Sequence, residues 1–404
     1  MAVPVRAPWP PSAHDAGAWL ASEQPQGVRR SRRALRGTLL GLLVLVMVAS
    51  GLVLLASETS ATGTPAFIIG VALASLPLPV VLAAFRWVDR FEPEPKALLA
   101  FAFFWGATVA ALFAGLLNTA SALAVARTSG GGEGMAATAV LVAPWVEEAA
   151  KGAAILGVFL FRRKEFDGVV DGIVLAGFVG VGFAFTENAL YFGRAFLAGN
   201  EEIGVTGGLF AAGITFVLRG VLAPFAHPLF TSMTGIGLGI AARSNRGVVK
   251  FLAPLAGYLL AVLLHATWNY SSLSGLQGFF TGYVLIFVPL FILAFLVTSW
   301  LRRREGAIIR TWLPVYVQAG WLADEDVAML SSLPRRKQAL EWAERTYGGG
   351  SSRALRDFQH VATELAFLRD RAERGHVEDF AERERELLAQ LARTRRAVSS
   401  PTRS

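Results

Sequence analysis

The sequence predicts an all-α, polytopic membrane protein, in which a bundle of about eight membrane-spanning helices precedes a small cytosolic helical domain. Three observations predict this fold class. The 404 residues are 54% hydrophobic but only 17% charged, whereas a soluble domain carries roughly 25% charged residues. Apolar runs of about 20 residues, the length that crosses a bilayer, recur from Leu39 to Trp300. After Trp300 the sequence becomes charged and periodic, as in amphipathic helices.

The composition divides the chain into three regions. Residues 1–36 are polar, contain several prolines and end in a cluster of arginines, which predicts a disordered, basic, cytoplasmic N-terminus. Residues 37–300 contain the apolar runs and form the predicted transmembrane domain. Residues 301–404 form the predicted cytosolic helical domain, in which the glycine- and serine-rich stretch 348–352 indicates a flexible joint. Apolar residues at helical spacing predict its core: Leu355, Phe358, Val361, Leu365, Leu368, Phe380, Leu387, Leu388 and Leu391.

The loops between the apolar runs alternate in charge. Basic clusters in every second loop predict that both termini are cytoplasmic, which requires an even number of crossings. Eight crossings satisfy this requirement. The predicted spans are about 38–56, 66–87, 97–126, 137–161, 168–192, 221–242, 251–270 and 279–300.

Residues 205–242 are too long for one span, yet the charges on either side require an odd number of crossings there. We therefore expect a short apolar helix at about 207–218, followed by a span from about 221. Arg219, Gly220 and Pro224 mark the expected break, as is typical of irregular backbone that is buried in protein.

The composition argues against two classes of function. The chain has no cysteine, which excludes disulfides, thiolate metal sites and cysteine nucleophiles. The net charge of +8 could indicate a nucleic-acid partner, but the arginines lie in short clusters beside apolar runs. They are better explained by orientation in the lipid bilayer, so no nucleic-acid partner is expected.

The strongest functional signal is Glu147, Glu148 and Lys151 in the middle of a predicted span. An ionisable residue near the bilayer centre costs roughly 2.5–3.5 kcal/mol, so it needs a partner or a function. Lys151 lies one helical turn after the glutamates and can reach either of them. A salt bridge that pins the bundle is the structural alternative. The second, uncompensated glutamate favours a functional role.

Three more polar positions interrupt the apolar runs. Glu187 and Asn188 follow a glycine-rich stretch that allows close helix packing. His227 is a further intramembrane histidine, and His265 shares a helix face with Asn269 four residues later. The structural alternatives are a polar helix end for Glu187 and hydrogen-bonded core histidines.

Depth in the membrane tests whether these residues can meet. The rise per residue of an α-helix, applied to the predicted spans, gives the depth of each residue in the bilayer. Four of them, each from a different span, lie in the outer half: Glu147, Glu187, His227 and His265. One shared site is therefore geometrically possible. Asp167 and Asp171 lie near the cytoplasmic end and are expected to be structural or regulatory.

Carboxylates, imidazoles and an amide suit the activation of water. One carboxylate, for which Glu147 is favoured over Glu148, takes the proton while His265 relays or polarises. Asn269 could donate to a developing oxyanion. Glutamate and histidine ligands, here Glu187, His227 and His265, could instead bind zinc. The His-Glu-x-x-His signature is missing, so the metal-free chemistry, with no cofactor, is favoured.

These motifs occur in a fixed order on successive helices: Glu147-Glu148-x-x-Lys151, Phe183-x-x-x-Glu187-Asn188, His227 and His265-x-x-x-Asn269. As a set they resemble the PrsW family of intramembrane proteases, which is related to the CaaX-protease and bacteriocin-processing superfamily. Residues 89–95 also resemble that family's cytoplasmic loop. The superfamily's Glu-Glu-x-x-x-Arg motif is replaced here by a lysine one residue earlier, which fits the PrsW variant. The resemblance spans about 86–300.

The resemblance implies a bacterial inner-membrane endopeptidase that cleaves membrane-anchored regulators such as anti-sigma factors. It implies Glu147 or Glu148 as the base, with Glu187 and His265 completing the site. The remaining motif residues would be supporting: Lys151, Asn188, His227 and Asn269. The family has been described as both glutamic and metallo-type, so the resemblance leaves metal dependence open.

Two other classes of function fit buried carboxylates and histidines. A proton-coupled transporter uses such residues as a relay, but the sequence has no internal repeat and no paired broken helices. A non-catalytic membrane sensor would act through residues 301–404.

Overall fold

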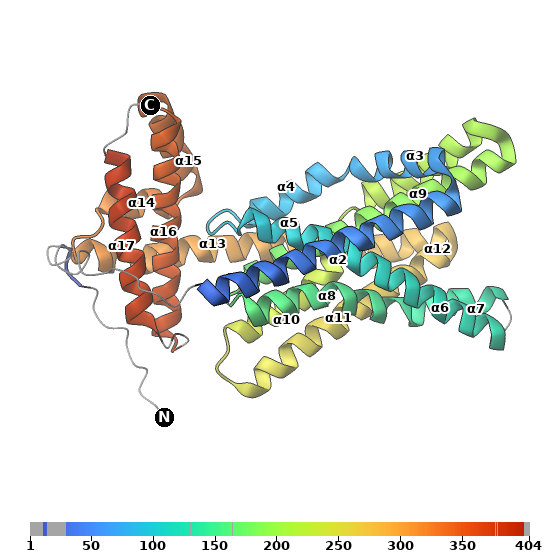
Figure 1. Ribbon diagram of the computed structural model, residues 1–404, viewed down its shortest axis with the longest axis horizontal. Helices are drawn as coiled ribbons and strands as arrows, with labels where there is room; N and C mark the ends of the chain where they lie inside the picture. Colours follow the sequence, from blue (N-terminus) through green and yellow to red (C-terminus); the bar gives the residue numbers. More distant parts are fainter. Residues whose placement is uncertain are drawn as a thin grey trace. The chain divides into compact units, whose positions relative to one another are not determined.

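The computed structural model describes residues 11–13, 30–129, 131–163, 165–375, 377 and 379–399. Most of the predicted N-terminal region, residues 1–36, lies outside these ranges. Within them the protein is all-α and contains no strand (Figure 1). The predicted fold class, a polytopic helical bundle, is confirmed.

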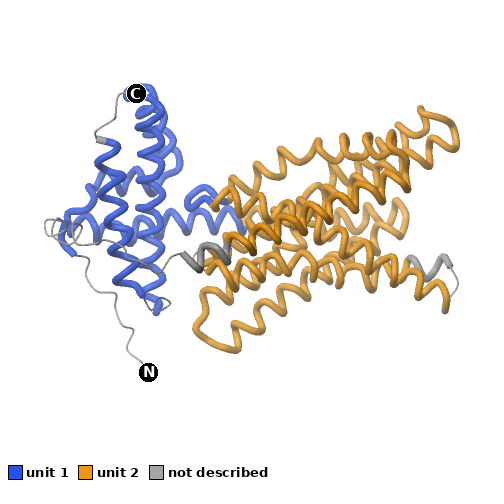
Figure 2. Tube along the Cα trace, in the orientation of Figure 1, with its two compact units in different colours: residues 1–28, 89–93, 297–404 blue, residues 29–88, 94–296 orange. Residues whose placement is uncertain are grey.

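The chain divides into two compact units, which Figure 2 draws in different colours. The membrane unit comprises residues 29–88 and 94–296. The C-terminal unit comprises residues 1–28, 89–93 and 297–404. The short loop 89–93 therefore belongs with residues that are distant in the sequence.

Six segments among the described residues are long and apolar enough to cross a membrane: Gly37–Thr62, Thr64–Val88, Lys96–Arg127, Val169–Ala242, Gly247–Leu273 and Gly275–Gln318. Helix α8 (Ala143–Phe161) is not among the six, and it carries Glu147, Glu148 and Lys151. The segment Val169–Ala242 contains two of the predicted spans. The protein is therefore a multi-pass membrane protein, and the predicted count of eight is approximate.

The membrane unit begins with α2 (Arg30–Thr62), α3 (Thr64–Ser75), α4 (Leu78–Val88), α5 (Lys96–Phe104), the π-helix η1 (Trp105–Ala110), α6 (Ala111–Ser129) and α7 (Gly131–Leu141). After α8 come α9 (Val169–Phe216), the π-helix η2 (Val217–Leu222), α10 (Ala226–Ala242), α11 (Gly247–Leu273), α12 (Gly275–Gly282), the π-helix η3 (Tyr283–Phe287) and α13 (Val288–Gln318). Helix α13 runs through the predicted domain boundary at residue 300 without a break.

The expected break near Arg219 lies a few residues later than predicted. Helix α9 kinks at Ile203 and at Gly204, whose φ is +75°. The chain then stays helical through Arg219 and Gly220 because η2 has π-type turns, and the helix ends only before Ala223. Pro224 lies in the break, as expected, since proline cannot continue the hydrogen-bond ladder.

Glycines on α9 allow its neighbours to approach closely. A Cβ on Gly172 would lie 2.1 Å from the carbonyl oxygen of Gly235 on α10. A Cβ on Gly182 would lie 1.9 Å from the carbonyl oxygen of Phe103 on α5. The small-residue packing that the sequence predicts therefore fixes α9 against both helices.

The C-terminal unit has its own apolar core, built from the end of α13 and from α14 (Asp324–Leu330), α15 (Leu333–Tyr347), α16 (Gly349–Glu373) and α17 (Phe380–Ser399). All nine predicted core residues of this region are buried in it. The predicted joint at 348–352 is much shorter than expected. Gly348, with a φ of +87°, separates the two helices, and Ser351 and Ser352 are buried within α16.

Candidate active site

Glu148 accepts hydrogen bonds on both of its carboxylate oxygens. Its side chain is completely buried. Oε1 accepts a hydrogen bond from Lys151 Nζ at 2.9 Å and lies 2.9 Å from His265 Nδ1. Oε2 accepts from Thr231 Oγ1 at 3.0 Å. Since both oxygens are occupied, Glu148 is suited to holding its neighbours in position.

Glu147, the preceding residue, has one oxygen that is not occupied in this way. Oε1 accepts from Asn118 Nδ2 at 3.0 Å. Oε2 is buried and has no hydrogen-bond partner among the described residues. It lies 3.5 Å from His265 Nε2 and 3.6 Å from Lys151 Nζ. This oxygen can accept a proton.

Lys151 joins the glutamate pair to the first histidine. Its ammonium group lies 3.2 Å from His227 Nδ1 and 3.7 Å from the centre of the Phe183 ring. Its side chain is fully buried, so the charge interacts with the protein and not with water. Because the α-helical turn brings residue 151 over residues 147 and 148, all three groups share one face of α8.

Glu187 joins the cluster from α9. Its Oε2 lies 2.7 Å from His227 Nε2. The same oxygen accepts a hydrogen bond from Arg219, whose Nε donates to Asn188 Oδ1 at 2.8 Å. Asn188 therefore supports the site through Arg219.

The two histidine rings meet at the centre. Their ring centres lie 5.0 Å apart at a steep angle, and the His265 ring stacks on Phe230. His227 lies in the first turn of α10 and His265 lies in α11, so four helices contribute to one cluster. The predicted site residues that the structure brings together are Glu147, Glu148, Lys151, Glu187, Asn188, His227 and His265.

The Asn269 side chain does not bond to the cluster in the described structure but to the backbone of α7. Its Nδ2 donates to the carbonyl oxygen of Ala139 in α7 at 2.8 Å. The amide thus ties α11 to α7, which fits a structural role better than donation to an oxyanion. Asp171 is also apart from the cluster, since its Oδ2 accepts from the backbone amides of Asp167 and Gly168 and caps α9.

One group of residues has the arrangement of metal ligands. Single ligand atoms of Glu147, His227 and His265 lie within 4.8 Å of one another. Glu147 thus takes the position that the sequence had suggested for Glu187. Glu147 Oε2 is buried without a hydrogen-bond partner in the described part of the chain. Carboxylate and imidazole donors of this kind fit zinc.

Another contact favours a metal-free His227. An ammonium group has donors only, so Lys151 Nζ donates to His227 Nδ1. A neutral imidazole that accepts at Nδ1 carries its hydrogen on Nε2, and a protonated nitrogen does not bind a metal.

Three residues of the cluster were not predicted as site residues. Asn118 and Thr231 bond to the glutamates, and Arg219 bonds to Glu187. Each is a polar residue inside an apolar run, which is the signal that could have found them. In the sequence, Arg219 indicates only a helix break.

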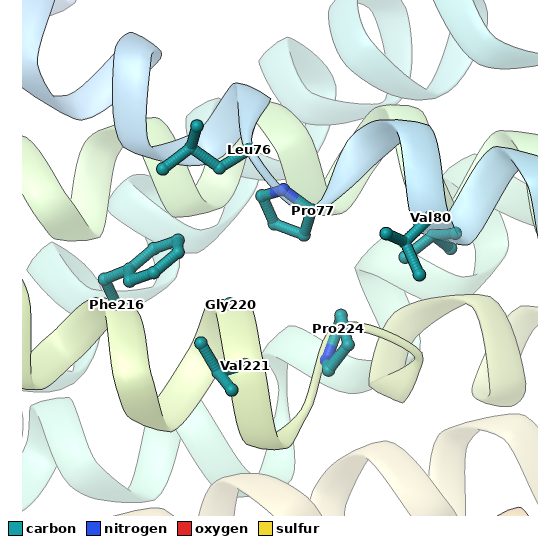
Figure 3. Close-up of a pocket in the computed structure, with 8 residues that line it drawn as sticks. Leu76, Pro77, Val80, Phe216, Gly220, Val221 and Pro224 are labelled. Atoms are coloured by element: carbon teal, nitrogen blue, oxygen red, sulfur yellow. The ribbon is translucent and has the colours of Figure 1, made fainter.

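An apolar cavity of about 270 Å³ lies next to η2 (Figure 3). Pro77, in the break between α3 and α4, and Pro224, in the break after η2, both line it. None of its lining residues is ionisable. The cavity is therefore separate from the polar cluster, although Gly220 in its wall follows Arg219 directly in the chain.

Comparison with known proteins agrees with the motif pattern. Residues 94–294 match the model of a family described as PrsW family intramembrane metalloprotease. Over 153 residues the chain is 31% identical to "Protease PrsW" of Oceanobacillus iheyensis, which covers 37% of this chain but only 60% of that protein. Over 207 residues it is 26% identical to "Protease PrsW" of Geobacillus kaustophilus, which covers 51% of this chain and 81% of that protein. No solved structure matches.

Proposed function

Because the chain belongs to the PrsW family through residues 94–294, we propose that it is an intramembrane endopeptidase. It hydrolyses a peptide bond in or near a membrane span of a membrane-anchored substrate. The observation that carries this proposal is the buried Glu147 Oε2, which has no hydrogen-bond partner in the described ranges and faces an imidazole nitrogen. Such a pair suits proton transfer from water.

Glu147 is the general base of the proposed reaction. A water molecule beside Oε2 gives its proton to this oxygen and attacks the carbonyl carbon of the substrate. His265 Nε2, 3.5 Å from Oε2, donates a proton to the leaving amine after receiving one from Glu147. The bond between carbon and nitrogen breaks, and the water oxygen remains on the new carboxyl group.

Glu148 orients the groups that react. Its contact with His265 Nδ1 at 2.9 Å keeps the hydrogen on that nitrogen and leaves Nε2 toward Glu147. Its bond to Lys151 holds a positive charge 3.6 Å from Glu147 Oε2. This fixed charge stabilises the negative charge that develops on the substrate.

Zinc would be held by Glu147, His227 and His265. When bound, it would supply a hydroxide nucleophile at neutral pH. The hydrogen bond from Lys151 to His227 Nδ1 favours the metal-free reaction, in which Glu147 alone takes the proton.

The charge pattern and the family support a proposal for location and substrate. We propose a bacterial inner-membrane protein with both termini in the cytoplasm, since the basic clusters lie in alternate loops. Its substrates are membrane-anchored regulators, with anti-sigma factors as the class to test first.

The test is cleavage of a co-expressed library of single-span reporter proteins. Cells that produce the wild-type protein should release fragments of some reporters, and cells that produce the Glu147→Ala variant at equal level should not. Equal fragment patterns from both would contradict the proposal and favour a transporter or a sensor.

A further inference from the structure

Arg219 is a charged residue in the middle of the long apolar segment Val169–Ala242. Its side chain is 16% exposed. It lies in η2, a π-helix, and π-type turns occur frequently at functional sites because they rotate a side chain out of the α-helical register. An arginine in this position needs partners.

The guanidinium group has three partners on one face of α9. It donates to Glu187 Oε2, and its Nε donates to Asn188 Oδ1 at 2.8 Å. Its Cζ lies 4.0 Å from the centre of the Tyr191 ring. Only arginine combines a planar fork of donors with stacking on an aromatic ring, so a lysine could satisfy part of this arrangement but not all of it.

Glu187 links this arginine to the reacting groups. The oxygen that accepts from Arg219 also lies 2.7 Å from His227 Nε2. His227 in turn contacts Lys151 at 3.2 Å and packs against the His265 ring. Two side chains, those of Glu187 and His227, therefore connect Arg219 to the centre of the cluster.

The charges of the cluster also require Arg219. Three carboxylates and two cations meet there: Glu147, Glu148, Glu187, Lys151 and Arg219. Lys151 bonds to Glu148 and Arg219 bonds to Glu187, while Glu147 Oε2 has no hydrogen-bond partner among the described residues. Without Arg219, the charge of Glu187 would compete for Lys151 and His227.

We propose that Arg219 is a positioning residue of the peptidase reaction. It neutralises Glu187 and holds its carboxylate against His227, so that Lys151 stays with the Glu147–Glu148 pair. This inference rests on the proposed function. The alternative is a purely structural ion pair that pins η2 to α9 and has no effect on the reaction once the protein is folded.

Purified wild type, Arg219→Gln, Glu187→Gln and the double variant are compared on one reporter selected from the library above. For Arg219→Gln we expect kcat to fall roughly 10–100-fold, the range typical of residues that orient the groups around a reacting site, with KM unchanged. Because Arg219 acts through Glu187, the double variant should match Glu187→Gln within about twofold. Arg219→Lys should recover part of the lost kcat, since it keeps the charge.

The matched control is Arg194→Gln. Arg194 is also on α9 and pairs with Glu58 at 3.4 Å, but its side chain is 61% exposed. This variant should keep the wild-type kcat. Folding of each variant is measured by size-exclusion chromatography and thermal unfolding in detergent, because a stranded buried charge can unfold a protein.

Several results would overturn the proposal. One is a folded Arg219→Gln variant with the wild-type kcat, and another is a raised KM with unchanged kcat. Effects of the two single variants that multiply in the double variant would also contradict it. If Arg219→Gln and the double variant do not fold while Arg219→Lys folds with full kcat, the residue is structural. If the wild type cleaves no reporter, the proposed function fails and this role fails with it.

Discussion

At the scale of single residues, Glu147 and Glu148 are neighbours in the chain but differ in their bonding. Glu148 uses both oxygens on Lys151, His265 and Thr231. Glu147 keeps one buried oxygen without a hydrogen-bond partner in the described part of the protein. Two chemically identical side chains can therefore have different roles, one orienting the site and one reacting, because their surroundings differ.

Lys151→Met tests how far the cluster depends on its buried cation. Removing one partner of a buried ion pair typically costs about 3–5 kcal/mol, because the other charge is stranded. We expect a strongly lowered thermal unfolding temperature and folded yield in detergent. Lys250→Met, at an exposed position of α11, is the matched control and should change neither. Equal, small effects of both would show that Lys151 does not hold the glutamates.

Metal analysis separates the two chemistries at this site. If Glu147 acts without a metal, purified active protein should contain far less than one zinc per chain, and a chelator should leave its cleavage rate unchanged. Elemental analysis and a chelator titration measure this. One zinc per chain, lost in His265→Ala together with activity, would make the cluster a zinc site.

Most ionisable residues of the cluster could be predicted from the sequence, because an ionisable residue is conspicuous and costly inside an apolar run. Arg219, which bonds to Glu187, is the exception. Glu147, Glu148, Lys151, Glu187 and the histidines were found in this way. Asn118 and Thr231 were not, since neutral polar residues are common in membrane helices and their partners depend on helix rotation. The rotation of each helix about its axis is determined by side-chain packing between helices. The periodicity of apolar residues in the sequence does not specify it.

At the scale of helices, the glycines of α9 allow the helices of the candidate site to pack closely. A Cβ on Gly180 would lie 2.7 Å from the Cα of Pro228 and 2.9 Å from the carbonyl oxygen of His227. This glycine therefore determines how closely the start of α10 approaches α9. Small residues have this role at many membrane helix interfaces.

Gly180→Ala should displace the backbone of His227 and lower the cleavage rate. Gly213→Ala, on the same helix, is the matched control because a Cβ there would meet nothing within 4 Å. Reporter cleavage and thermal unfolding are measured for both. A fully active, stable Gly180→Ala variant would show that the close approach of these helices is not needed.

Helix boundaries were less predictable than the helices themselves. The sequence indicated a break from Arg219, but π-type turns carry the helix to Leu222 and turn Arg219 toward α9. It also indicated an end near Trp300, whereas α13 continues to Gln318. Such continuation depends on tertiary contacts that override local composition.

At the scale of the whole molecule, the loop 89–93 between α4 and α5 belongs to the C-terminal unit. Phe91 is buried in the core of that unit. Its carbonyl oxygen accepts from Arg336 Nη1 at 3.1 Å, and its ring lies 5.1 Å from the guanidinium carbon. Burial lowers the pKa of Arg336 to about 10, so the group is still charged at neutral pH and donates to the loop.

Phe91→Ala should therefore destabilise the C-terminal unit, although the residue is distant from it in the sequence. Truncating a buried phenylalanine typically costs about 3–5 kcal/mol. Hydrogen exchange in the full-length protein should show faster exchange in α15 and α16. Trp342→Ala, at an exposed position of α15, is the control and should leave the exchange unchanged. Unaltered exchange in Phe91→Ala would mean that the loop does not contribute to this core.

The central claim is that Glu147 activates water for peptide-bond hydrolysis inside the membrane unit. Its most direct test is cleavage of a purified single-span reporter by purified wild type and Glu147→Gln, with the fold of both verified by thermal unfolding. We predict cleavage by the wild type and none by a Glu147→Gln variant that is equally well folded. Full cleavage by a Glu147→Gln, Glu148→Gln double variant would contradict the account.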